Sequence, residues 1–287
     1  MEAIWIIAVG SLIAISCGLL GSFLVLRKMA MVGDAISHAV LPGIVLAYLF
    51  SGSRGTIPML IGAAALGVLT TLLIELFYKQ AKLQVDASIG ITFTWLFAIG
   101  IILISLFAGQ VDLDQDCVLY GEIAYVPLDL WIIGDFNLGP RTLYIAGFML
   151  LVVLFIIVRG YKGLFLTTFN EEYASALGIK VAFWHYLLMS SVSLTTVIAF
   201  EAVGAILVVA FLIVPPATAY LLTNQLKSML WLTALFAVLS SVFGYYLAVL
   251  INGSIAGAMA SVAGILFVMV WGYTVLKRRV EPKLIQK

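Results

Sequence analysis

Charged residues are scarce in this 287-residue sequence: Asp, Glu, Lys and Arg make up 10% of it, whereas hydrophobic residues make up 64%. A water-soluble domain of this length needs a polar surface, and there are too few polar residues to build one. Runs of about 20 apolar residues, long enough to cross a bilayer as a helix, recur along the chain. The composition therefore predicts an all-α, polytopic membrane helix bundle, with residues 1–287 forming a single domain.

Several other chemistries lack the residues they require. The net charge of +1, with no long block of like charge, excludes a strongly basic nucleic-acid binder. No G-x-x-x-x-G-K-[ST] motif occurs, so the chain has no ATP-binding P-loop of its own. With only two histidines and two cysteines in the whole chain, a closed structural zinc site is hard to build. We expect a protein that is not an enzyme and holds no tightly bound cofactor.

Stretches without charge delimit the membrane spans. They are residues 3–26, 35–53, 55–74, 87–111, 142–158, 181–200, 202–226 and 228–276. The last stretch is too long for one crossing, and Asn252-Gly253-Ser254 supplies a turn near its middle. This predicts nine transmembrane helices. Eight remains open, because 35–53 and 202–226 contain prolines and could be partly re-entrant.

The basic residues predict the orientation, because short cytoplasmic loops are enriched in Lys and Arg. They follow alternate spans and place the N-terminus outside and the C-terminus inside, with Arg54 as the exception; the inner positions are Arg27, Lys28, Lys79, Lys82, Arg159, Lys162, Lys227 and 277–279. The connection 112–135 has six acidic residues and no basic one, so it should face outward. This outer acidic loop either attracts cations or docks a partner, or is simply solvated.

Ionisable groups at membrane depth are costly and indicate candidate sites. Asp34 and His38 are four residues apart, so on a helix they share one face. A carboxylate oxygen and an imidazole nitrogen suit manganese, iron or zinc. Pro42 has no N–H and leaves the carbonyl of His38 without its helical partner. Alternatively, Asp34 caps a helix start and a backbone carbonyl satisfies His38.

A second candidate is Glu201, which stands alone between two apolar runs and lies either at membrane depth or at the outer surface. Pro215 and Pro216 follow, and we expect them to unwind their helix and free carbonyl oxygens. His185 lies near the cytoplasmic start of its span, where a structural role is favoured.

The cytoplasmic loop 159–180 contains a predicted short helix. Asn170 is a good N-cap, Glu171 and Glu172 suit the first turn, and Gly178 suits the C-terminus. Such a helix is either a simple loop helix or an element that docks into a cytoplasmic partner.

Three segments together resemble a known family. They are Gly33-Asp-Ala-Ile-Ser-His-Ala-Val-Leu-Pro-Gly43, the helix 170–178, and Val214-Pro-Pro-Ala-Thr-Ala219. In this order they are similar to the integral membrane permeases of bacterial ABC importers for manganese, zinc and iron, and the similarity covers about residues 3–276.

The resemblance implies a fold related to the vitamin and siderophore importers, in the bacterial cytoplasmic membrane. It implies a second permease subunit, identical or paralogous, two cytoplasmic ATPase subunits, and an extracytoplasmic metal-binding lipoprotein. Asp34 and His38 correspond to residues that contact the transported ion. The helix with Asn170, Glu171, Glu172, Ala174 and Gly178 corresponds to the coupling helix that binds the ATPase. The segment 111–122 looks more like the manganese or iron members than the zinc members.

Two other classes remain open. In a secondary transporter driven by an ion gradient, Asp34 and Glu201 would carry protons or cations. That transporter does not need the helix 170–178. In an intramembrane enzyme, Asp34 and His38 would hold a catalytic metal, but the sequence offers no further ligand cluster.

Overall fold

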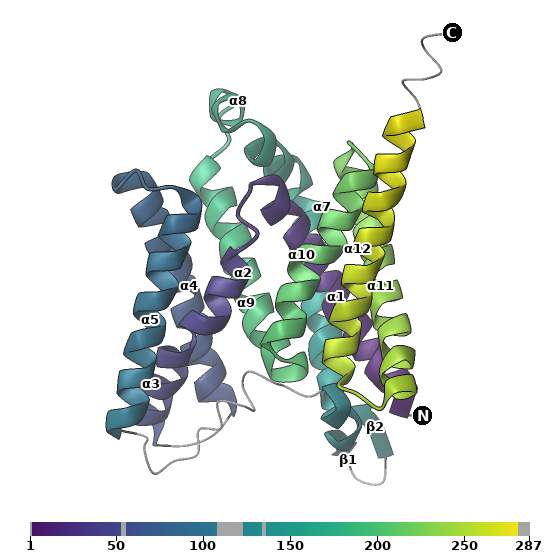
Figure 1. The fold of residues 1–287 in the computed structure, drawn as a ribbon. Helices are drawn as coiled ribbons and strands as arrows, with labels where there is room; N and C mark the ends of the chain where they lie inside the picture. The colour runs from purple at the N-terminus through teal and green to yellow at the C-terminus, as the bar shows by residue number, and fades with distance from the viewer. Residues whose placement is uncertain (1, 53–55, 108–122, 134–135, 281–287) are drawn as a thin grey trace. The chain divides into compact units, whose positions relative to one another are not determined.

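The structure is a computed structural model and describes residues 2–52, 56–107, 123–133 and 136–280 (Figure 1). Nine segments of this described part are long and apolar enough to cross a membrane, which agrees with the larger of the two predicted numbers. They are α1 (Glu2–Leu26), α2 and α3 together (Val32–Ala39 and Leu41–Ser51), α4 (Thr56–Gln80), α5 (Val85–Phe107), α7 (Arg141–Phe169), α9 (Val181–Val203), α10 (Ala205–Leu222), α11 (Leu226–Ile251) and α12 (Ile255–Val280).

Short elements connect some of these spans. They are a 3₁₀ helix η1 (Ile123–Leu128), the antiparallel strands β1 (Leu130–Ile133) and β2 (Phe136–Pro140), and the six-residue helix α8 (Glu171–Ala176). Residues 112–122 and 134–135 of the predicted outer acidic loop lie outside the described residues.

Most helix ends agree with the sequence prediction, and two helices are longer than predicted. The turn at Asn252 is confirmed: this residue has φ +50° and separates α11 from α12. Helix α4 continues past the predicted end at residue 74 to Gln80, and α7 continues past residue 158 to Phe169. Both helices therefore include charged residues beyond their predicted ends, Glu75 and Lys79 in α4 and Arg159 and Lys162 in α7.

The chain divides into two compact units. Unit 1 comprises residues 1–25, 122–152 and 206–287, and unit 2 comprises residues 26–121 and 153–205.

Unit 1 packs through small residues. A Cβ at Gly21 of α1 would overlap the carbonyl of Leu212 in α10, and a Cβ at Gly18 would crowd the Thr233 side chain in α11. The hydroxyls of Ser22 and Thr233 lie 3.2 Å apart and form a buried hydrogen bond. Close backbone approach of this kind is the usual way in which helices associate in lipid.

Unit 2 surrounds the short helix α2, which contacts α3, α4, α5 and α9. Gly43 of α3 and Gly62 of α4 meet backbone to backbone, because a Cβ at either glycine would overlap the carbonyl of the other. Val32, Ala35 and Ile36 of α2 are almost completely buried. This packing fixes which face of α2 its polar residues occupy.

Candidate functional site

Asp34 and His38 share one face of α2, as their spacing predicts. His38 Nε2 lies 3.7 Å from Asp34 Oδ1, and the two side chains are 34% and 33% exposed. The imidazole packs on two rings of α5: its centroid lies 5.9 Å from that of Phe93 and 5.7 Å from that of Phe97. The two aromatic rings hold the imidazole beside the carboxylate while leaving both polar groups accessible.

Pro42 interrupts the span immediately after this pair. Helix α2 ends at Ala39 and α3 begins at Leu41, with Pro42 in the first turn of α3, where its missing N–H is tolerated. Pro42 cannot donate to the carbonyl of His38, which is the partner that an uninterrupted helix would provide. The polar pair therefore reaches from the first turn of the short half-helix α2, at Asp34, to its last turn, at His38, next to a break in the span.

One chain offers this site two strong ligands. Within the described ranges, no group of three or more His, Cys, Asp or Glu side chains lies close enough to hold one metal ion. An ion held by Asp34 and His38 needs further ligands from carbonyls, water or another subunit.

Glu201, the second candidate residue, lies on a different helix from Asp34 and His38. It is exposed and lies in the last turn of α9, which ends at Val203 with Gly204 at φ +81°. This position is the end of a span.

The predicted unwinding at Pro215 and Pro216 is wrong, because α10 runs without a break from Ala205 to Leu222. These prolines cannot donate to the carbonyls of Phe211 and Leu212. The two carbonyls face α1 in unit 1, at Gly18 and Gly21, where the absence of a Cβ allows the backbones to approach. The helix nevertheless continues through both prolines.

The predicted helix after α7 is present and capped at both ends. Asn170 Oδ1 accepts a hydrogen bond of 2.9 Å from the backbone N–H of Tyr173. At the other end, Gly178 has φ +77° and its N–H donates to Ser175, while Ile179 N–H donates to Ala174. These two bonds form a Schellman motif. Among the named residues Ala174 is buried, whereas Glu171, Glu172 and Gly178 are exposed.

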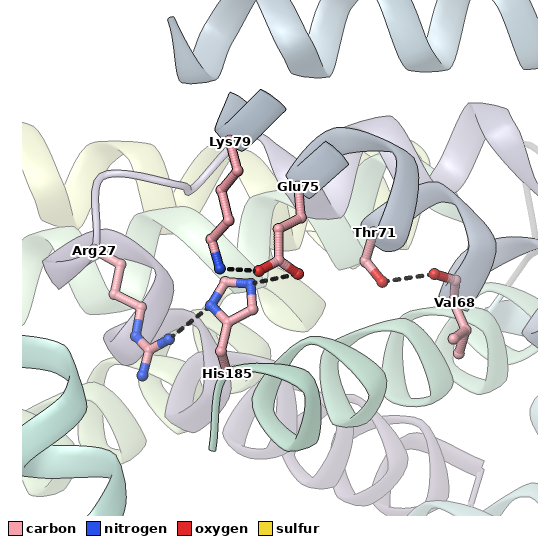
Figure 2. Close-up of polar contacts among 6 residues, drawn as sticks. All are labelled: Arg27, Val68, Thr71, Glu75, Lys79 and His185. Atoms are coloured by element: carbon pink, nitrogen blue, oxygen red, sulfur yellow. Dashed lines mark hydrogen bonds and ion pairs between the residues drawn. The ribbon is translucent and has the colours of Figure 1, made fainter. Parts of the chain in front are cut away.

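His185 joins a polar cluster that the sequence reasoning missed (Figure 2). Its Nε2 lies 3.6 Å from Glu75 Oε2, and Lys79 donates to Glu75 Oε1. Arg27 donates to His185 Nδ1 over 3.2 Å. The Glu75 and His185 side chains are 7% and 13% exposed. The signal that could have indicated this cluster from the sequence is the spacing of four residues between Glu75 and Lys79.

Arg27 lies between two spans, and its electrostatic environment reaches α8. Burial lowers the pKa of the Arg27 guanidinium, while the carboxylate of Glu171 opposes this shift. Glu171, in the first turn of α8, therefore belongs to the electrostatic environment of Arg27.

Comparison with known proteins gives matches along nearly the whole chain. The model of the ABC 3 transport family matches residues 2–273. The manganese transport system membrane protein MntD of Bacillus subtilis is 49% identical over 263 residues, which is 92% of this chain and 89% of MntD. The zinc transport system membrane protein TroD of Treponema pallidum is 42% identical over 93% of this chain and 72% of TroD.

Solved structures of transporters are also similar to this chain along most of its length. A chain of PsaBC from Streptococcus pneumoniae, in complex with a Fab, superposes with a TM-score of 0.75 at 34% identity, over 93% of this chain and 90% of that one. A metal-chelate type ABC transporter in an inward-facing conformation superposes with a TM-score of 0.62 at 17% identity, over 96% and 85% of the two chains. The second match concerns the fold alone.

Proposed function

Because this chain belongs to the ABC 3 transport family, we propose that it carries a divalent transition metal into the cell, with manganese as the first candidate and zinc or iron next. It is a multi-pass protein of the bacterial plasma membrane. The observation that carries the proposal is the Asp34–His38 pair on the half-helix α2. Relatives named for manganese and for zinc transport support the class of substrate.

The ligand types favour a borderline or hard metal ion. Asp34 offers oxygen and His38 offers nitrogen, and no thiolate lies in the described part of this site. Such a set suits manganese, iron and zinc. Zinc nevertheless binds more tightly than manganese to almost any site of this composition. Selectivity therefore rests mainly with an extracytoplasmic lipoprotein that delivers the ion, and the permease binds weakly enough to release it.

A second permease subunit completes the site. Two ligands from one chain are too few to replace the water shell of a divalent ion. A second copy or a paralogue, arranged symmetrically, brings another carboxylate and another imidazole. The pathway then runs between two α2 helices.

This chain has no P-loop of its own, so a separate ATPase has to hydrolyse the ATP. Helix α8 is the contact for that cytoplasmic ATPase. Beside its acidic first turn, α8 and its flanks expose Phe169, Tyr173 and Leu177, each more than half accessible. Exposed aromatic residues such as Phe169 and Tyr173 are typical of protein interfaces. Asn170 and Gly178 fix the ends of the helix, whereas the buried Ala174 holds it against the chain's own core.

A secondary transporter driven by an ion gradient is the alternative class of carrier. An ion-gradient-driven carrier has no use for an exposed helix that binds an ATPase. The match to an ABC transport family also gives no support to that alternative.

The test of this function is the metal content of cells with and without the chain. We expect its deletion to lower manganese accumulation first and manganese in the medium to restore growth. Rescue by zinc alone, with cellular manganese unchanged, would assign zinc as the substrate. Unchanged uptake of manganese, zinc and iron would refute the proposal.

A further inference from the structure

Arg27 makes three hydrogen bonds at the cytoplasmic end of unit 2. Its Nε donates to Thr168 Oγ1 over 3.1 Å, and its Nη2 donates to Thr167 Oγ1 over 3.0 Å. Its Nη1 donates to His185 Nδ1 over 3.2 Å. The planar guanidinium has donors pointing in all three directions, which the single ammonium of a lysine does not reproduce.

This arrangement fixes the protonation of the imidazole. Arginine only donates, so His185 Nδ1 has to present its lone pair. The ring proton then sits on Nε2, which faces Glu75 Oε2 at 3.6 Å (Figure 2). The other carboxylate oxygen of Glu75 accepts from Lys79. Arg27, His185, Glu75 and Lys79 thus form a directed chain of polar contacts, which we call the Arg27 cluster.

The Arg27 cluster is not a second metal site, although it pairs the chain's other histidine with a carboxylate. A neutral imidazole that accepts from Arg27 has no lone pair left on Nε2 for an ion. The charges of Arg27 and Lys79 also repel a divalent cation. The cluster therefore connects parts of the protein and does not bind a metal ion.

The connection joins the two elements on which transport depends. Thr167 and Thr168 lie in the last turn of α7, directly before Asn170, the N-cap of α8. Arg27 itself precedes α2, which begins at Val32 and carries Asp34 two residues later. Glu171 attracts Arg27 from α8. A displacement at the base of α8 therefore acts directly on the segment that leads into α2.

We propose that Arg27 is a positioning residue that couples the base of α8 to the entry of α2, so that movement of the ATPase contact shifts the Asp34–His38 pair. This inference rests on the proposed role of α8. Coupling between distant sites requires a physical element that both sites bias, and the Arg27 cluster supplies one in hydrogen bonds and charges.

The test compares Arg27→Lys with Lys28→Asn in the complete transporter reconstituted in liposomes. Lys28 is the exposed neighbour in the same loop, and asparagine tolerates its φ of +58°. The readouts are manganese carried per ATP hydrolysed, and cross-linking of a cysteine at Ala176 to the ATPase. We expect Arg27→Lys to keep hydrolysis and cross-linking but lower the transport ratio about tenfold, within the usual range for coupling between sites. Lys28→Asn should match the unmodified protein.

Two results would overturn the inference. A normal transport ratio in Arg27→Lys would show that Arg27 transmits nothing. Loss of cross-linking from Ala176 in that variant would show that Arg27 only keeps α8 folded. In either case the unmodified complex would still carry its metal ion, whereas failure of the unmodified complex to carry manganese, zinc or iron would refute the proposed function itself.

Substitutions of His185 give an independent test. In His185→Asn the amide oxygen takes the place of Nδ1 and still accepts from Arg27, whereas His185→Gln places its amide near Glu75 and loses that acceptor. If Arg27 transmits the movement, the asparagine variant keeps the higher transport ratio. The reverse order contradicts the inference.

Discussion

The C-terminus of α8 offers a graded test of the ATPase contact. Gly178 has φ +77°, and a Cβ there would meet nothing within 4 Å among the described atoms, so a substitution costs only backbone strain. For alanine the left-handed conformation costs roughly 1–2 kcal/mol, which lowers the population of the capped helix about 5- to 30-fold. Asparagine tolerates this conformation better. Proline cannot adopt it and also removes the N–H that donates to Ser175.

We therefore expect the amount of metal transported per ATP hydrolysed to be highest in Gly178→Asn, lower in Gly178→Ala and lowest in Gly178→Pro. The assay is uptake and hydrolysis by the reconstituted complex. The matched control is Gly264→Ala in α12, which also has open space but lies within a helix, where alanine is favoured. Normal coupling in both Gly178→Ala and Gly178→Pro, at normal expression, would refute the role assigned to α8.

Charge reversal of Glu171 and Glu172 to lysine should weaken the binding of the ATPase, because it places positive charge at a helix N-terminus and beside Arg27; co-purification of the ATPase measures this. Gly21→Leu should prevent accumulation of folded protein, since its side chain would overlap the Leu212 carbonyl and overpacking costs about 1–3 kcal/mol or more. Gel filtration of the detergent-extracted variant checks this, and a normal monodisperse peak would contradict the packing of α1.

Local rules predicted much of the fold. Long apolar runs gave the nine spans of the described chain, because a bilayer sets the minimum length of a helix. The turn at Asn252 and the caps at Asn170 and Gly178 follow from side-chain and backbone preferences of single residues. The spacing of Asp34 and His38 alone predicts that they share one helix face, and the structure confirms this.

Features that depend on distant partners could not be predicted in this way. The span of α4 was expected to end before Glu75, yet Glu75 is buried because Lys79 and His185 pair with it. Similarly, Gly253 and Gly257 form a small-residue motif, but a Cβ at Gly257 would meet only Ser254 within the described structure. Close approaches of the backbone occur instead at Gly21 in unit 1 and between Gly43 and Gly62 in unit 2. The sequence shows that one face of a helix carries small residues, but not which neighbouring helix packs against that face.

The most direct test of metal transport through α2 is uptake by the variants Asp34→Ala and His38→Ala in whole cells. Membrane insertion should persist, because removing a polar group from a span does not impair insertion. Manganese uptake should fall to the level of cells that lack the chain, since each variant loses one of the two proposed ligands of the ion. Uptake at the normal rate by both variants, at normal expression, would contradict the site.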